Sequence, residues 1–217
     1  MVEMSGIRVK TLVVGMVGTN CYLVYEDETK KTVIVDPGDN ADRISAECRK
    51  LGLVPEAILL THGHFDHMMA APELKKEWGI PILAPEKELE ILADGEKNLV
   101  MNYYGQSWSL TPDKTVKEGE VLELAGFSWK VMETPGHTIG SCCYYIEKED
   151  VLFSGDTLFH MSYGRTDLPT GSGKSIAYSV SRLLKELPED VMVYPGHMDP
   201  TTIGTEKKYN PLARLHL

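Results

Sequence analysis

Five of the seven histidines in this 217-residue chain lie at only three places along the sequence. Imidazole is a frequent ligand for zinc, manganese and iron. An ion held by such ligands can bring the pKa of a bound water to about 7, which turns the water into a nucleophile at neutral pH. The clustered histidines therefore predict a metal site, and they are His62, His64, His67, His137 and His197.

The densest cluster is the segment Thr61-His62-Gly63-His64-Phe65-Asp66-His67. Its ligand-type side chains are too closely spaced to act as one helical pair, which would need positions i and i+4. In an extended or looped segment, His62 and His64 share one side, which leaves Asp66 and His67 to reach a second ion. The segment therefore predicts two ions, about 3.5 to 4 Å apart.

The other candidate ligands follow glycines. Thr134-Pro135-Gly136-His137 and Tyr194-Pro195-Gly196-His197 share one design, and Ser154-Gly155-Asp156 follows an apolar strand in the same way. Glycine lets the backbone turn sharply, so that the next side chain projects from the edge of a sheet. A single loop of this kind could carry an ordinary polar residue. Four loops that each follow a predicted strand and carry ligand-type side chains favour a metal site. Asp156 is the natural carboxylate to bridge two ions.

Short apolar runs between turn residues predict strands ahead of each ligand loop, and helical spacing of apolar residues predicts helices between them. The predicted strands are Arg8–Val13, Cys21–Tyr25, Thr32–Val35, Ala57–Leu60, Pro81–Ala84, Glu120–Leu124, Phe127–Glu133, Cys142–Ile146, Val151–Ser154 and Val191–Tyr194. The predicted helices are Ala41–Leu51, Met68–Trp78, Pro85–Leu92 and Ser175–Leu187. This alternation predicts an α/β protein.

Residues 94–117 have weaker periodicity, and we expect an irregular excursion there. Its aromatic residues Tyr103, Tyr104 and Trp108 either line a pocket or anchor the loop. A second irregular segment, Gly171-Ser172-Gly173-Lys174-Ser175, looks like the end of a phosphate-binding loop. That motif needs a glycine where this chain has Leu168, so we expect a helix start at Ser172 or Gly173 and no nucleotide.

The composition is that of a globular protein, with 42% hydrophobic and 25% charged residues, and we expect one domain over residues 1–217. The net charge of -10, without any run of Lys or Arg, argues against nucleic-acid partners. The apolar stretch Leu12–Val17 is too short for a signal peptide or a membrane span. We therefore expect a cytoplasmic protein with no membrane partner.

The cysteine pattern agrees with a reducing compartment. The four cysteines include no CxxC pair, so reduced thiols are the simplest interpretation. The adjacent Cys142 and Cys143 would point to opposite faces of a strand, which disfavours their use as a metal-ligand pair.

Together, the ligand loops resemble the metallo-β-lactamase superfamily, and within it the short single-domain branch of the glyoxalase II-like (hydroxyacylglutathione hydrolase) proteins. This resemblance implies an αββα four-layer sandwich, with the site at one edge of its two sheets. The segments that carry it, besides residues 61–67, are Thr19-Asn20-Cys21-Tyr22, Val35-Asp36-Pro37-Gly38, Gly136-His137-Thr138, Ser154-Gly155-Asp156-Thr157, Pro195-Gly196-His197 and Thr201-Thr202-Ile203-Gly204.

The resemblance also divides the ligands between two divalent ions, which we expect to be zinc, with iron or manganese as alternatives. One ion takes His62, His64 and His137, the other takes Asp66, His67 and His197, and Asp156 bridges them. Asp66 and Asp156 are the candidate catalytic residues. The implied reaction is attack of metal-bound hydroxide on a small-molecule thioester such as the glutathione conjugate S-lactoylglutathione.

Two other activities fit the same loops. Persulfide dioxygenases resemble this chain as well and use a single iron, which would fall here on His62, His137 and Asp156. The segment Gly164-Arg165-Thr166-Asp167 is similar in both groups, but residues 201–207 look like the short hydrolase branch, so hydrolysis is favoured. A lactone or phosphodiester hydrolase would keep the metal site and change only the pocket. The complete ligand set disfavours a non-catalytic scaffold.

Substrate-binding residues are less clearly marked. Full-length glyoxalase II proteins continue into a helical region that grips glutathione, whereas this sequence ends at Leu217, so we expect that grip to be absent or replaced. Arg165 could bind a substrate carboxylate, or could instead pair with Asp167. Tyr103, Tyr163 and Lys207 are weaker candidates. His160 and His216 have no motif context, and we expect ordinary surface or packing roles for them.

Overall fold

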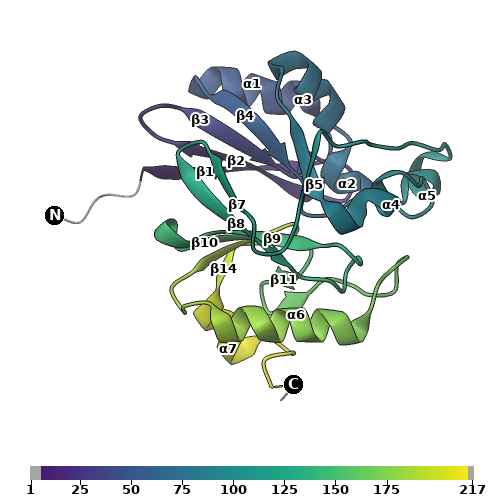
Figure 1. The fold of residues 1–217 in the computed structure, drawn as a ribbon, viewed down its shortest axis with the longest axis vertical. Helices are drawn as coiled ribbons and strands as arrows, with labels where there is room; N and C mark the ends of the chain where they lie inside the picture. Colours follow the sequence, from purple (N-terminus) through teal and green to yellow (C-terminus); the bar gives the residue numbers. More distant parts are fainter. Residues whose placement is uncertain (1–5, 215–217) are drawn as a thin grey trace.

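The computed structural model describes residues 6–214, so His216 lies outside the described residues. Two six-stranded sheets lie face to face, and helices cover the outer face of each sheet (Figure 1). The layers therefore follow the order helix, sheet, sheet, helix, which confirms the predicted αββα sandwich. None of the helices within residues 6–214 is long and apolar enough to cross a membrane.

The first sheet has the order β1-β2-β3-β4-β5-β6. The pairs β1–β2 and β2–β3 are antiparallel, and the remaining pairs are parallel. Parallel neighbours need crossover connections, and on the outer face α1 connects β3 to β4 and α3 connects β4 to β5. These elements are β1 (Ile7–Val14), β2 (Thr19–Glu26), β3 (Lys31–Val35), α1 (Ala41–Leu51), β4 (Val54–Leu59), α3 (Ala71–Trp78), β5 (Ile82–Pro85) and β6 (Lys114–Val116).

The second sheet has the order β14-β13-β10-β9-β8-β7. The long helix α6 connects the parallel strands β10 and β13 and covers the outer face together with α7 (Figure 1). These elements are β7 (Val121–Leu124), β8 (Phe127–Glu133), β9 (Cys142–Ile146), β10 (Val151–Gly155), α6 (Gly173–Glu186), β13 (Met192–Pro195), β14 (Thr201–Thr202) and α7 (Ile203–Tyr209).

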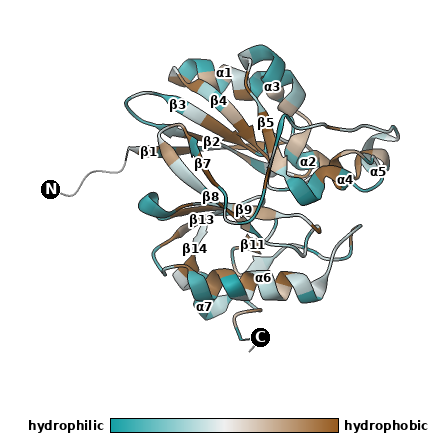
Figure 2. Ribbon diagram, in the orientation of Figure 1, coloured by the Kyte–Doolittle hydropathy of each residue, from teal (hydrophilic) through white to brown (hydrophobic). Residues whose placement is uncertain are grey.

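Apolar side chains fill three layers of core, and hydrophobic residues accordingly concentrate along the strands, whereas hydrophilic residues are frequent on the helices (Figure 2). Cys142 belongs to the cluster between the sheets and Cys143 to the cluster under α6, as alternation along a strand predicts. Hydrogen bonds join the two sheets near the ligand loops. The Tyr22 hydroxyl donates to the Pro195 carbonyl at 2.6 Å.

Several predicted boundaries are wrong. The predicted helix Met68–Trp78 is two helices, α2 (Phe65–Met68) and α3, because Pro72 suits the first turn of a new helix. The predicted helix Pro85–Leu92 is also divided, since Pro85 ends β5. A 3₁₀ turn (Glu86–Glu88) and the short α4 (Leu89–Leu92) follow it.

Short elements escaped prediction. The irregular excursion contains α5 (Val100–Tyr104) and the edge strand β6. The prediction also missed three two-residue strands, the last helix and a 3₁₀ turn. These are β11 (Leu158–Phe159), β12 (Ser162–Tyr163), β14, α7 and the 3₁₀ turn Glu147–Glu149. In contrast, α6 begins as expected, with the Ser172 hydroxyl accepting a hydrogen bond from the Ser175 amide at 3.2 Å.

Candidate metal centre

The topology brings the four ligand loops to one edge of the sandwich. Strands β8 and β10 both pair antiparallel with β9, and β13 pairs parallel with β10, so these three strands run in the same direction and end at the same edge. The loop after β4 in the first sheet meets them there, where the Cys142 amide donates to the Thr61 carbonyl at 2.9 Å. The backbone N–H of Asn20 likewise donates to the Gly196 carbonyl at 2.8 Å.

All seven predicted ligands lie together at this edge. Their ligand atoms fall into three overlapping groups, and within each group all atoms lie within 4.8 Å of one another. The groups are His62, His64 and His137, then His62, His67 and Asp156, then Asp66, His67 and His197. The first and third groups match the two ligand sets that the resemblance implies.

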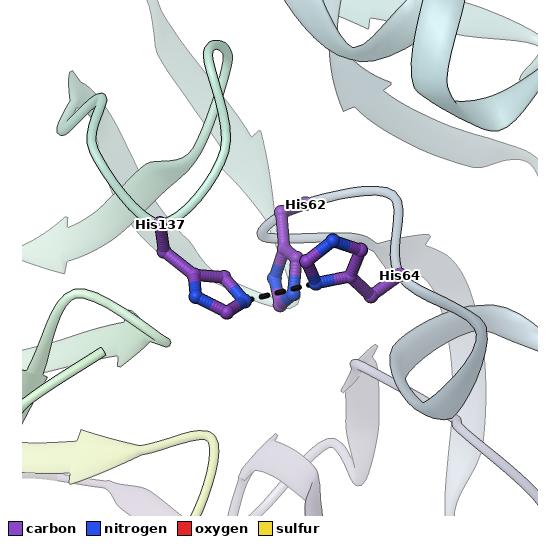
Figure 3. Close-up of side chains that lie close together, drawn as sticks. All are labelled: His62, His64 and His137. Atoms are coloured by element: carbon purple, nitrogen blue, oxygen red, sulfur yellow. Dashed lines mark hydrogen bonds between the residues drawn. The ribbon is translucent and has the colours of Figure 1, made fainter. Parts of the chain in front are cut away.

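The first group gathers imidazoles from two different loops (Figure 3). The Nδ1 atom of His64 lies 2.9 Å from Nε2 of His137, and the His62 ring stands nearly perpendicular to both other rings. Two ring nitrogens facing each other at this distance can both serve one ion placed between the rings. The geometry thus suits a shared cation.

Asp156 lies between the two sets. One carboxylate oxygen, Oδ1, is 3.4 Å from Nε2 of His67. The other, Oδ2, is 3.5 Å from Nε2 of both His137 and His197. A carboxylate in this position can contact both ions at once.

Buried atoms without partners show that the residues fit metal ions. Among the described residues, Nε2 of His62, Nε2 of His67 and Oδ1 of Asp156 are buried and have no hydrogen-bond partner. These residues form the middle group. Burying a polar atom without a partner is costly, and bound ions would satisfy all three atoms.

The charges around the site also suit a cation. Burial lowers the pKa of His64 to about 3, so its ring stays neutral and keeps a lone pair for a metal. Burial opposes a charge on His67, but Asp66, Asp156 and Asp36 hold its pKa well above the usual value. Carboxylates around His67 therefore stabilise positive charge at this point, which divalent ions would supply.

Asp36, at the end of β3, orients His67 and was not predicted as a functional residue. Its Oδ2 accepts hydrogen bonds from the Thr61 hydroxyl at 2.6 Å and from Nδ1 of His67 at 3.0 Å. Its Oδ1 accepts from the Thr61 amide at 2.7 Å. With Nδ1 donating, Nε2 of His67 is free to bind metal. His137 is held similarly, because its Nδ1 donates to the Arg165 carbonyl at 2.8 Å.

Glu88 joins two ligand loops and was also missed. Its side chain is fully buried, and one oxygen accepts from the Gly63 amide at 2.7 Å. The other oxygen accepts from the Gly140 amide at 2.7 Å and from the Thr138 hydroxyl at 2.8 Å. Burial raises the pKa of Glu88 to about 7, and these three hydrogen bonds oppose that rise. Glu88 therefore ties the loop of His62 to the loop of His137.

We predict that Glu88→Gln weakens metal binding about 10- to 100-fold, the range found for groups that support metal ligands. The amide has one acceptor oxygen, so its NH₂ group must face the backbone N–H of Gly63 or that of Gly140, donor against donor. Chelator competition measures the metal affinity, and circular dichroism checks the fold. Glu86→Gln, an exposed change in the same turn, is the matched control. Equal metal affinity in both variants would contradict this role.

The substrate candidates lie in different places. Tyr103 and Arg165 line the cavity above the ligands, and Arg165 forms two hydrogen bonds with Asp167, at 2.7 and 2.6 Å. The structure does not bring the other two candidates to this cavity. Tyr163 packs against the core under α6, and the Lys207 ammonium donates to the Leu187 carbonyl at 3.0 Å, at the end of that helix.

Comparison with known proteins identifies the family. The family model described as "Metallo-beta-lactamase superfamily" matches residues 14–197. "Hydroxyacylglutathione hydrolase GloC" of Haemophilus influenzae is 36% identical over 194 residues, which cover 88% of this chain and 91% of that protein.

Two solved structures are similar over nearly their whole length. The crystal structure of "BLEG-1 B3 metallo-beta-lactamase" has a TM-score of 0.90 and 37% identity, and the match covers 95% of this chain and 100% of that chain. The crystal structure of TTHA1623 "in a di-iron-bound form" has a TM-score of 0.81 and 34% identity, with 94% and 99% covered.

Proposed function

This chain belongs to the metallo-beta-lactamase superfamily, and we propose that it is a two-metal hydrolase that cleaves small-molecule thioesters, as hydroxyacylglutathione hydrolases do. The position of Asp156 between two complete ligand sets is the observation that carries the proposal. The two sets together offer enough ligands for two ions, whereas a single iron would use only three of these seven residues.

In the proposed reaction, His62, His64 and His137 would hold one ion, and Asp66, His67 and His197 would hold the other. When bound, the two ions lower the pKa of water and polarise the substrate carbonyl. The residues around the ligands fix the positions of the side chains that would bind these ions. Asp36 holds His67 in the tautomer that leaves Nε2 free, and the Thr19 hydroxyl donates to Oδ2 of Asp66 at 2.7 Å.

Zinc is the metal that we propose, with iron or manganese as alternatives, because histidine and carboxylate ligands accept all three. The di-iron form of TTHA1623, a protein 34% identical to this chain, supports a two-ion site and keeps iron in consideration. All four cysteines are free and buried, which agrees with the proposed cytoplasmic location.

The alternatives predict different metal contents or substrates. A mononuclear-iron persulfide dioxygenase would need only His62, His137 and Asp156. A lactone or phosphodiester hydrolase would use both ions, and the likeness to BLEG-1 adds β-lactams to the substrates to be tested. Thioesters are preferred because of the relative named as a hydroxyacylglutathione hydrolase.

The first experiment is elemental analysis of protein purified without added metal, paired with assays of S-lactoylglutathione hydrolysis and of oxygen uptake with glutathione persulfide. We expect about two ions per chain and thioester cleavage. One iron per chain with oxygen uptake would instead identify a dioxygenase. Two ions with neither activity would support the two-metal site and contradict the proposal that thioesters are the substrates.

A variant distinguishes the two-metal hydrolase from the single-iron dioxygenase. His197→Ala removes a ligand of the second ion only, so we expect about one ion per chain to remain and thioester cleavage to be lost. In a single-iron dioxygenase, the same change would leave the iron in place. His160→Ala, outside all three ligand groups, is the control.

A further inference from the structure

We infer that the preferred substrates carry a neutral, apolar group beside the scissile bond, in preference to the small hydroxyacyl group of S-lactoylglutathione. This inference rests on the proposed hydrolase function and concerns which thioesters fit the cavity. Three features of the residues around the ligands lead to it: the lining of the cavity, its charges and two exposed methionines next to lining residues in the sequence.

The cavity above the ligands is small, and its lining away from the ligands is mostly apolar. Its volume is about 140 Å³, below the roughly 300 to 1,000 Å³ of typical small-molecule sites, so it can accept the reacting group and one adjoining substituent. Beyond the metal ligands and Arg165, every lining residue is apolar or aromatic. These residues are Val17, Phe65, Leu99, Tyr103 and Leu168.

Phe65 and Tyr103 form an aromatic wall. Their ring centroids are 4.3 Å apart with an interplanar angle of 31°. Phe65 is buried, and its amide donates to the Asn98 carbonyl at 2.9 Å, which fixes the wall beside His64. Tyr103 is 48% exposed, so one side of it remains free to contact a substrate. A flat apolar substituent would bury this surface.

The cavity offers little to an anionic substrate. Arg165 is the one Lys or Arg among the described lining residues, and Asp167 already occupies its planar fork. Glutathione carries two carboxylates, so at least one of them would lack a cationic side chain as partner in this cavity, and the two ions are needed for the reacting group. Away from the ions, the net charge of -10 on the polypeptide adds repulsion.

A neighbouring hollow reinforces this charge pattern. Tyr104, whose ring centroid is 5.9 Å from that of Phe65, lines it. Its charged lining residues are Asp39, Asp42, Arg43 and Glu73, which carry a net negative charge. A bulky anionic thiol extending in this direction would meet carboxylates.

Two exposed methionines stand next to lining residues in the sequence. Met16 precedes Val17 and is 63% exposed, and Met198 follows His197 and is 54% exposed. A substrate that extends from the cavity towards either residue would meet an adaptable apolar side chain.

A matched pair of thioesters tests the inference. S-mandeloylglutathione differs from S-lactoylglutathione by a phenyl group in place of a methyl group. We expect kcat/KM to be about 10- to 100-fold higher for the mandeloyl ester, since a phenyl group buries more apolar surface. Transfer of the mandeloyl group to the neutral thiol N-acetylcysteamine should not lower kcat/KM.

Two variants test whether Tyr103 is responsible for the preference for the mandeloyl ester. Tyr103→Ala should bring the ratio of mandeloyl to lactoyl kcat/KM towards one, whereas Tyr178→Ala should leave it unchanged, because Tyr178 is an exposed residue of α6 outside the cavity. A wild-type ratio of one or less, with hydrolysis intact, would overturn the inference and leave the proposed function standing.

Binding of non-hydrolysable thioethers tests the inference without turnover. S-benzyl-N-acetylcysteamine should bind the metal-loaded protein about tenfold more tightly than the S-methyl analogue, as measured by calorimetry. Equal affinities would overturn the inference even if no thioester were cleaved. Preferential binding without cleavage of any thioester would support the apolar site and reject the hydrolase proposal.

Discussion

Replacement of Asp156 with alanine is expected to abolish turnover and to release metal. Its two oxygens lie 3.4 to 3.5 Å from Nε2 atoms of His67, His137 and His197, so the change removes a ligand from both ion positions at once. It also removes one of the carboxylates that stabilise positive charge at His67. We expect kcat/KM to fall by at least about 1,000-fold.

Two measurements are needed for this variant: the metal content per chain and kcat/KM for the best thioester. Asp190→Ala is the matched control, because Asp190 is exposed and precedes β13, whereas the ligand loop follows that strand. We expect the control to keep both ions and full activity. An Asp156→Ala protein with two ions and full activity would contradict the proposal of a bridged two-metal site.

Gly38→Ala is expected to have the largest effect of any change outside the ligands. A methyl group on Gly38 would lie 1.5 Å from the carbonyl oxygen of Asp66 and 2.5 Å from its carbonyl carbon. Because backbone atoms make this contact, no side-chain rotation can relieve it. We expect the free energy of unfolding to fall by about 3 kcal/mol or more. The metal content should also fall, because Asp66 and His67 must move.

Gly173→Ala is a control at a glycine with space around it. The nearest atom to the added methyl group would be Oγ1 of Thr166, at 3.7 Å. Alanine also favours helix, and Gly173 is the first residue of α6, so the free energy of unfolding should stay equal or rise slightly. Denaturant unfolding of both variants provides the comparison. Unchanged stability and metal content in Gly38→Ala would show that this turn does not fix Asp66.

The candidate metal ligands could be located from the sequence because each follows a local pattern. Gly136 and Gly155 have φ angles of 145° and 49°, so the glycines before His137 and Asp156 do make the sharp turns expected of them. Glu88 follows no such pattern, whereas Asp36 follows a predicted strand within a segment of the resemblance, but its partners could not be predicted. Asp36 reaches Thr61 only because β3 and β4 are parallel neighbours, and that pairing is not visible in the order of residues.

Glu88 shows the same limit more strongly. Its partners Gly63 and Thr138 are 25 and 50 residues away in the sequence, and no spacing rule connects them. A glutamate in a charged turn is also typical of an exposed residue, whereas here the fold buries it.

Element length decided how much of the fold could be predicted. Strands with several alternating or continuous apolar residues were recognised, but β6 has three residues and β14 has two, too few to show a period. The division of the strands between two sheets was implied by the family resemblance and not by periodicity. Pro72 lies inside the predicted helix Met68–Trp78, where proline disfavours a continuous helix, so the sequence did signal this break and the apolar spacing masked it.

The hydrogen bonds that join the two sheets have a consequence for folding. The backbone amide of Asn20 donates to the carbonyl of Gly196, next to the second sheet. The backbone amide of Cys142 donates to the carbonyl of Thr61, next to the first sheet. Neither proton can exchange with solvent through fraying of a single sheet. We expect hydrogen exchange at these two amides to require separation of the sheets, so that it reports global unfolding. Because both partner carbonyls lie beside ligands, loss of metal should accelerate exchange at both amides together.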